Sequence, residues 1–197
     1  MKFDRLKVTG FEEIQLNAGI VMFNFNPETA EVRDEDIIGF TSGGMSFSAT
    51  PTYTNFGEDI DNCPANMKDL KRLSSVEVTL SGTFVSMNAK NAKVLMASAD
   101  ADSSNAAHLI PRNDLLQTDF TGIWLVADYS DKNGATKGGF MAVHIKNALN
   151  TGGFQWQTTN KGKGQFPFTF TGHYSMTAQD EVPYDLYVKA GEDEPTE

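Results

Sequence analysis

Residues 38–73 read IGFTSGGMSFSATPTYTNFGEDIDNCPANMKDLKRL, a clear strand pattern followed by a long polar run. From Met45 to Tyr53 apolar and hydroxyl side chains alternate strictly, which is the period of a half-buried β-strand. Pro51 lies inside this strand and has no N–H for the ladder, so we expect a strand at the edge of a sheet or one that leaves it. The polar run from Thr54 to Arg72 predicts an unusually long loop, and such loops are commonly functional.

The rest of the chain predicts a mainly β domain. Asn133-Gly134 indicates a hairpin turn, and the apolar run 120–129 before it is expected to be a central, buried strand. One helix is expected over 88–100, with Asn88 as its N-cap. We therefore expect an antiparallel β-sandwich or barrel with one packed α-helix. The other expected strands are 19–26, 76–87, 140–149, 154–158, 165–174 and 184–190, and the segment 35–40 is expected to continue the sheet after a turn.

Size and charge restrict the classes of function. The 197 residues fit one domain, and we expect an N-terminal arm over 1–18, a β domain over 19–189 that includes the loop 54–72, and an acidic tail over 190–197. With 26 acidic and 16 basic residues the net charge is -10, which disfavours nucleic-acid binding because phosphate contacts need Lys and Arg. The first residues lack the apolar core of a signal peptide, and no apolar run is long enough to cross a bilayer. We expect synthesis and folding in the cytosol.

The sequence offers few groups for catalysis. His108, His144 and His173 are far apart, and no Gly-x-Ser-x-Gly motif is present. Cys63, the only cysteine, excludes an internal disulfide, and we interpret it as an incidental loop residue. We expect no enzyme and no cofactor.

Two short motifs imitate binding sites. The start of a calcium loop at Asp100–Asn105 lacks the glycine at its sixth position and the glutamate at its twelfth. We therefore interpret Asp100 and Asp102 as helix-end and loop residues, and expect no metal site. The basic run Lys161–Gly164 lacks the context of a P-loop, and we interpret it as a basic hairpin tip, with a charge that is able to contact an acidic neighbour in an assembly.

The order and spacing of these features resemble the major tail (tail tube) proteins of long-tailed bacteriophages, over roughly residues 16–188. The resemblance covers an opening strand LNAGIVMFNF, the strand entry IGFTSGGMSFSATPTY, the acidic loop NFGEDIDNCPANMKDLKRL, and a strand followed by a helix at 76–100. It continues through the closing hairpins, including the strand PFTFTGHY. None of these motifs is chemically specific by itself, so their order carries the resemblance.

The resemblance implies a structural virion protein. Copies would close into hexameric rings, and the rings would stack into a hollow tube around a tape-measure protein, with terminator and baseplate or initiator proteins at its ends. DNA would pass through this tube on infection. The protein would be made in the host bacterial cytoplasm and reside in the virion tail, with no membrane insertion.

Two sets of residues are assigned on this basis. The loop is expected to stay solvated until assembly and to order on contact with a neighbouring ring or subunit. The hydroxyl side of the preceding strand is expected to face the lumen, where uncharged groups let DNA slide. The lumen candidates are Ser46, Ser48, Thr50 and Thr52. The contact candidates are Asn55, Phe56, Glu58, Asp59, Asp61, Lys68, Lys71 and Arg72.

Three other interpretations stay open. The chain is also compatible with a tube subunit of a contractile tail, tailocin or secretion system, or with another tail component such as a terminator or baseplate protein. A β-sandwich module that binds carbohydrate is the third. That module needs exposed aromatic rings; Trp124 is expected to be buried, which leaves Trp156 as its candidate.

Overall fold

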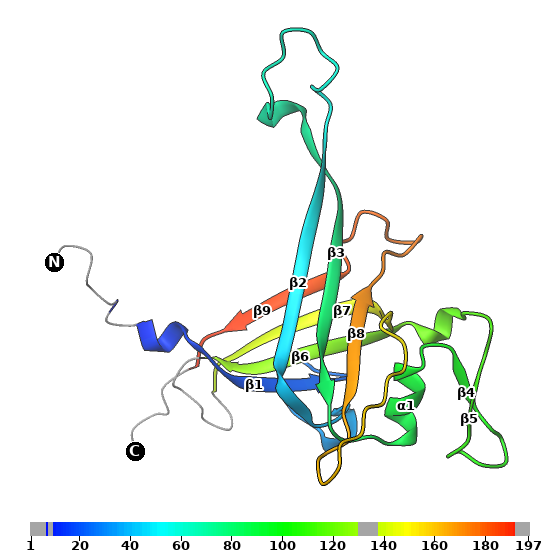
Figure 1. Ribbon diagram of the computed structural model, residues 1–197. Helices are drawn as coiled ribbons and strands as arrows, with labels where there is room; N and C mark the ends of the chain where they lie inside the picture. The colour runs from blue at the N-terminus through cyan, green and yellow to red at the C-terminus, as the bar shows by residue number, and fades with distance from the viewer. Residues whose placement is uncertain (1–6, 8–9, 130–137, 192–197) are drawn as a thin grey trace.

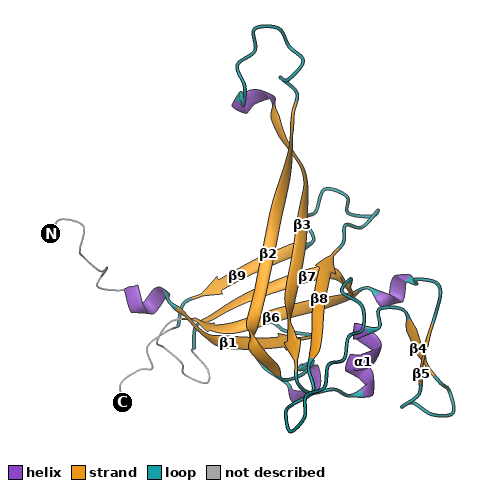
Figure 2. Cartoon of the chain, in the orientation of Figure 1, coloured by secondary structure: helices purple, strands orange, loops and turns teal. Residues whose placement is uncertain are grey.

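The computed structural model describes residues 7, 10–129 and 138–191. Strands make up 47% of the chain and helices 10%, so the expectation of a mainly β protein is confirmed. Figure 2 shows the helical segments only at the margins of the sheet. The strands are β1 (Gln15–Met22), β2 (Thr41–Asn55), β3 (Lys71–Phe84), β4 (Ala99–Ala101), β5 (Leu109–Pro111), β6 (Thr121–Tyr129), β7 (Phe140–Asn150), β8 (Phe166–Gly172) and β9 (Tyr184–Lys189). The helix α1 is Ala89–Leu95, and 3₁₀ turns lie at Gly10–Glu13, Asp34–Asp36, Lys68–Leu70 and Gln117–Asp119.

Seven strands form one curled antiparallel sheet in the order β1-β6-β7-β8-β3-β2, with β9 paired to β7. The sheet folds over where the end of β7 leaves β9 and pairs with β8, at Ala148–Asn150. As a result β2, β3 and β8 lie across β1, β6, β7 and β9 (Figure 1). The predicted neighbours 120–129 and 140–149 do pair antiparallel, whereas Asn133-Gly134 lies outside the described residues.

The main core lies between these two halves of the sheet. Val78 and Leu80 of β3 and Phe170 of β8 pack in one cluster with Ile123 of β6 and Ile145 of β7, all with no exposed surface. A second cluster covers the other face of β6 and β7, where Trp124 is 8% exposed as predicted. Because β6 is covered on both faces, its sequence is apolar without alternation.

The helix begins where the sequence predicted. The Asn88 side chain accepts a hydrogen bond from Asn91 N at 2.9 Å, which is the N-cap interaction. The helix ends at Leu95, short of the predicted 88–100, because Ala97 adopts a left-handed φ of 63° and Ala99 then enters β4. Asp100 is therefore a strand residue rather than a helix-end residue, and Asp102 lies in the turn after it.

Two further boundaries differ from the prediction. The sheet begins at Gln15, so the expected arm 1–18 contains the first residues of β1. The sequence hides this start because Asn17, with a left-handed φ of 62°, interrupts the alternation at a shift in the β1–β6 register. The acidic tail lies outside the described residues from 192 onward.

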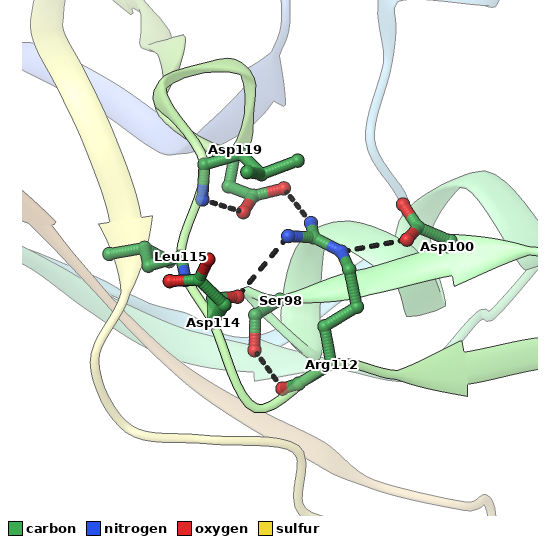
Figure 3. A network of polar contacts seen from close by, with 7 residues as sticks. Ser98, Asp100, Arg112, Asp114, Leu115 and Asp119 are labelled. Atoms are coloured by element: carbon green, nitrogen blue, oxygen red, sulfur yellow. Dashed lines mark hydrogen bonds and ion pairs between the residues drawn. The ribbon is translucent and has the colours of Figure 1, made fainter.

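Arg112 joins the β4–β5 hairpin to the segment that leads into β6 (Figure 3). Its Nη2 donates to Asp119 Oδ1 at 2.6 Å, and its Nε lies 2.8 Å from Asp100 Oδ2. The Asp119 side chain is only 5% exposed, and its second oxygen accepts from Leu116 N at 2.8 Å. This ion-pair network holds a segment in which Leu115 and Leu116 are each 44% exposed.

Candidate assembly surface

The β2–β3 hairpin extends beyond the rest of the sheet (Figure 1). The two strands pair as far as Asn55 opposite Lys71, whereas β3 pairs with β8 only from Val78 onward. The outer part of the hairpin therefore has no further strand beside it in the described chain. Pro51 lies on β2, which pairs with β3 alone among the described strands, and this confirms the predicted edge strand.

The predicted loop 54–72 is shorter in the structure, where residues 56–70 join the strands. Thr54 pairs with Arg72 and Asn55 with Lys71, because backbone ladder pairing does not require apolar side chains. The prediction, which used polar composition alone, therefore assigned residues at both ends of the loop that belong to β2 and β3. The same effect shortened β3 in the prediction, which began at Val76 instead of Lys71.

The end of the hairpin contains backbone hydrogen bonds of its own. Phe56 N donates to Leu70 O at 3.0 Å, and Cys63 N donates to Ile60 O at 3.1 Å. Gly57 is buried, and a Cβ there would lie 2.9 Å from Cys63 Sγ. Cys63 thus packs inside the loop, so the glycine and the cysteine together keep the turn compact.

The predicted contact residues divide into two groups. Phe56, 64% exposed, lies with the exposed residues Glu58, Asp59 and Asp61 in the tip loop, by which we mean residues 56–67. The others lie at its base: the Asn55 side chain accepts from Gly57 N at 3.1 Å, and Lys71 Nζ is 4.8 Å from the centroid of the Tyr53 ring. Arg72 Nη1 donates to Asp69 O at 3.0 Å, and Lys68 is exposed in the adjoining 3₁₀ turn. The acidic groups therefore project, whereas Asn55, Lys71 and Arg72 contact their own hairpin.

Of the large apolar residues on this surface, sequence reasoning identified only Phe56. Tyr53 and Ile60 are 53% and 52% exposed, and Leu73 and Met67 are 52% and 36% exposed. Ile60 and Met67 are isolated apolar residues within the polar run, and Tyr53 and Leu73 stand at its two ends, which is the signal that could have identified them. Large apolar side chains grouped on an exposed hairpin indicate an interaction surface.

The four lumen candidates, Ser46, Ser48, Thr50 and Thr52, are all exposed on one face of β2, as the alternation predicted. The hydroxyl character continues across β3 and β8, which the prediction did not include. Directly paired positions on this face are Ser81, Thr79, Glu77 and Ser75 of β3, followed by Thr169 and Thr171 of β8. Glu77 is the only charged residue among these positions, so the face is hydrogen-bonding and nearly neutral.

The histidines lie in three separate places. His144 stacks on Trp124 with ring centroids 4.2 Å apart, and its burial lowers its pKa below the ordinary value, although Asp185 at 3.8 Å opposes this. His108 contacts Asp102 at 3.1 Å, and His173 contacts the Asn147 carbonyl at 3.1 Å. In the described residues no three His, Cys, Asp or Glu side chains are grouped to hold a metal. The same residues contain no helix long and apolar enough for a membrane span.

The strand predicted over 154–158 is a loop between β7 and β8, in which Trp156 is 65% exposed and Phe154 is 44% exposed. Both rings lie close to Phe166, with centroids 6.2 and 6.4 Å from it. The sequence Lys161–Gly164 forms the turn of a small hairpin closed by Gln157 and Gln165, as predicted.

No protein-family model matches this chain, and no curated protein sequence matches it. We therefore infer function from the surfaces described above.

Proposed function

We propose that this chain is the structural subunit of a bacteriophage tail tube. Copies of it form hexameric rings that stack into a hollow tube in the virion tail, and DNA is delivered to the host through this tube. Tape-measure, terminator and baseplate or initiator proteins are its proposed partners, and it has no catalytic role in this proposal.

The long hairpin β2–β3 is the single observation that carries the proposal. A strand of 15 residues at a sheet edge presents unpaired N–H and C=O groups, which soluble proteins normally cover or shorten. Pairing with another copy satisfies those groups, and a head-to-tail contact that closes on itself gives a ring. The exposed tip loop then reaches past the ring that contains its own body.

The hydroxyl-bearing face that runs across β2, β3 and β8, which we call the hydroxyl face, gives separate support for the proposal. Ser46, Ser48, Thr50 and Thr52 are joined by the hydroxyls of β3 and β8, with Glu77 as the only charge among the paired positions. DNA binding requires Lys and Arg to neutralise phosphates, so this surface holds no phosphate tightly. A tube lumen through which DNA moves needs that property.

Negative-stain electron microscopy of the purified protein, at low and high concentration, tests the proposal. Rings or hollow tubes are expected. Asn55 and Lys71 face each other across the hairpin, so replacing residues 56–70 with Asn-Gly closes it with a two-residue turn. This variant is expected to keep its fold by circular dichroism and to lose stacking.

A matched control shortens a different hairpin in the same way. Ala101 faces Leu109, so residues 102–108 between β4 and β5 are replaced with Asn-Gly, and this variant is expected to stack normally. Wild-type protein that stays monomeric at every concentration, even with tail-initiator proteins added, contradicts the tube. Glycan binding by that monomer then indicates the carbohydrate-binding alternative.

A further inference from the structure

The loop between β7 and β8 presents an aromatic surface with positive charge. We define the basic platform as Phe154, Trp156, Lys161 and Lys163, all exposed. Phe166 of β8, which packs against the main core, supports both aromatic rings. Backbone hydrogen bonds of 2.9 Å between Gln157 and Gln165 in both directions close the hairpin that carries the lysines.

The platform lies in the least acidic part of an acidic protein. Between Asp131 and Asp180 the sequence contains five lysines and no acidic residue, although the whole chain has a net charge of -10. Neither Lys161 nor Lys163 has an ion-pair partner within the described residues. The charge on this loop is therefore available to an outside partner.

The tip loop has the complementary composition. Residues 56–67 contain Glu58, Asp59 and Asp61 and no basic residue, and they expose Phe56 before the carboxylates and Ile60 between them. Each surface thus combines large apolar side chains with charge of a single sign, and the two signs are opposite. Complementary charge of this kind selects the partner and fixes the register of a contact.

The two surfaces lie at opposite ends of the molecule. Figure 1 shows the cyan-to-green end of the β2–β3 hairpin at the top and the gold loop before β8 at the bottom, and Figure 2 shows the same arrangement. One copy therefore cannot join its own tip to its own platform. Between copies, a head-to-tail contact that does not close into a ring repeats along an axis.

We propose that the tip loop of one copy docks on the basic platform of a copy in the next ring. Carboxylates of Glu58, Asp59 and Asp61 meet Lys161 and Lys163, and Phe56 packs against Trp156. This inference depends on the proposed tube function and supplies the acceptor surface for stacking.

Charge reversal tests the contact. Lys161→Glu/Lys163→Glu places like charges together and is expected to raise the protein concentration needed for stacking about tenfold or more. Glu58→Lys/Asp61→Lys has the same expected effect. The chain that carries all four changes restores opposite charges and is expected to stack again. Tube length by electron microscopy and sedimentation velocity are the readouts, with the fold of each variant checked by circular dichroism.

Arg33→Glu/Lys93→Glu is the matched control, because it makes the same change of charge at two exposed residues outside both surfaces. It is expected to stack like the wild type. If wild-type tubes form and Lys161→Glu/Lys163→Glu assembles at the wild-type concentration, the docking contact is wrong and the tube function stands. Loss of stacking in both double variants without recovery in the four-change chain also rejects the direct pairing. If the wild type forms neither rings nor tubes, the proposed function itself fails.

Discussion

At the residue scale, His144 couples the fold to pH. It lies directly opposite Trp124 across β6 and β7, with the two rings stacked at an interplanar angle of 8°. Burial lowers its pKa from the ordinary 6.5, and Lys146 lowers it further, while Asp185 raises it in part. The unfolded chain then binds a proton more readily than the folded chain, so stability is lost as pH falls through 6.5 toward the folded pKa. Between about pH 7.5 and 5 the melting temperature of His144→Gln is expected to fall less than that of the wild type.

Carboxylates also contribute to acid sensitivity, so the comparison between variants isolates the histidine. His108→Gln changes an exposed histidine on the β4–β5 turn, and its pH profile is expected to follow the wild type. If His144→Gln shows the wild-type profile as well, burial of His144 does not determine the pH response.

At the scale of elements, Arg112 holds the segment between β5 and β6. Removing this guanidinium leaves the carboxylate of Asp119, 5% exposed, without its cation. Arg112→Met is expected to lower the free energy of unfolding by about 3 kcal/mol, because an uncompensated buried charge is costly. Arg112→Met/Asp119→Asn removes that charge while an amide oxygen can still accept from Leu116 N, so it is expected to recover part of the loss. Urea unfolding gives the free energy of unfolding of the wild type and of both variants.

An exposed ion pair gives the contrast. Arg33 and Glu31 are 3.2 Å apart with both side chains 58% exposed, so Arg33→Met is expected to cost at most about 1 kcal/mol. Equal losses for Arg112→Met and Arg33→Met would show that burial of Asp119 has no effect on the strength of its pair.

Sequence patterns predicted elements well where side chains alternate or repeat. The strand at Met45–Tyr53, its edge position from Pro51, the buried strand 120–129 and the Asn88 N-cap all follow from local rules. The ends of the strands and of the helix could not be predicted from these local rules. Ladder pairing at Lys71–Ser75 and the left-handed Asn17 and Ala97 depend on backbone partners or conformations that composition does not reveal.

At the scale of the whole molecule, the candidate surfaces were only half predictable. Alternation in β2 identified Ser46, Ser48, Thr50 and Thr52, because one face of a single strand can be read locally. Their continuation into Thr79 and Thr171 depends on which strands become neighbours, and that is set by the order of the sheet. The opposite placement of the tip loop and the basic platform is likewise a property of the complete fold.

The hydroxyl face gives the last prediction. If it lines the lumen, lysines placed on it will hold DNA that the native surface releases. Ser48→Lys/Thr50→Lys adds cations at two exposed positions of β2, and repetition around each ring produces a basic band. Tubes of this variant are expected to retain labelled duplex DNA at low salt and to release it steeply as salt rises, because retention depends on released counterions. Ser48→Gln/Thr50→Gln adds similar bulk without charge and is expected to retain none. Variant tubes that assemble normally yet leave all DNA free at low salt would show that this face of β2 does not line the channel.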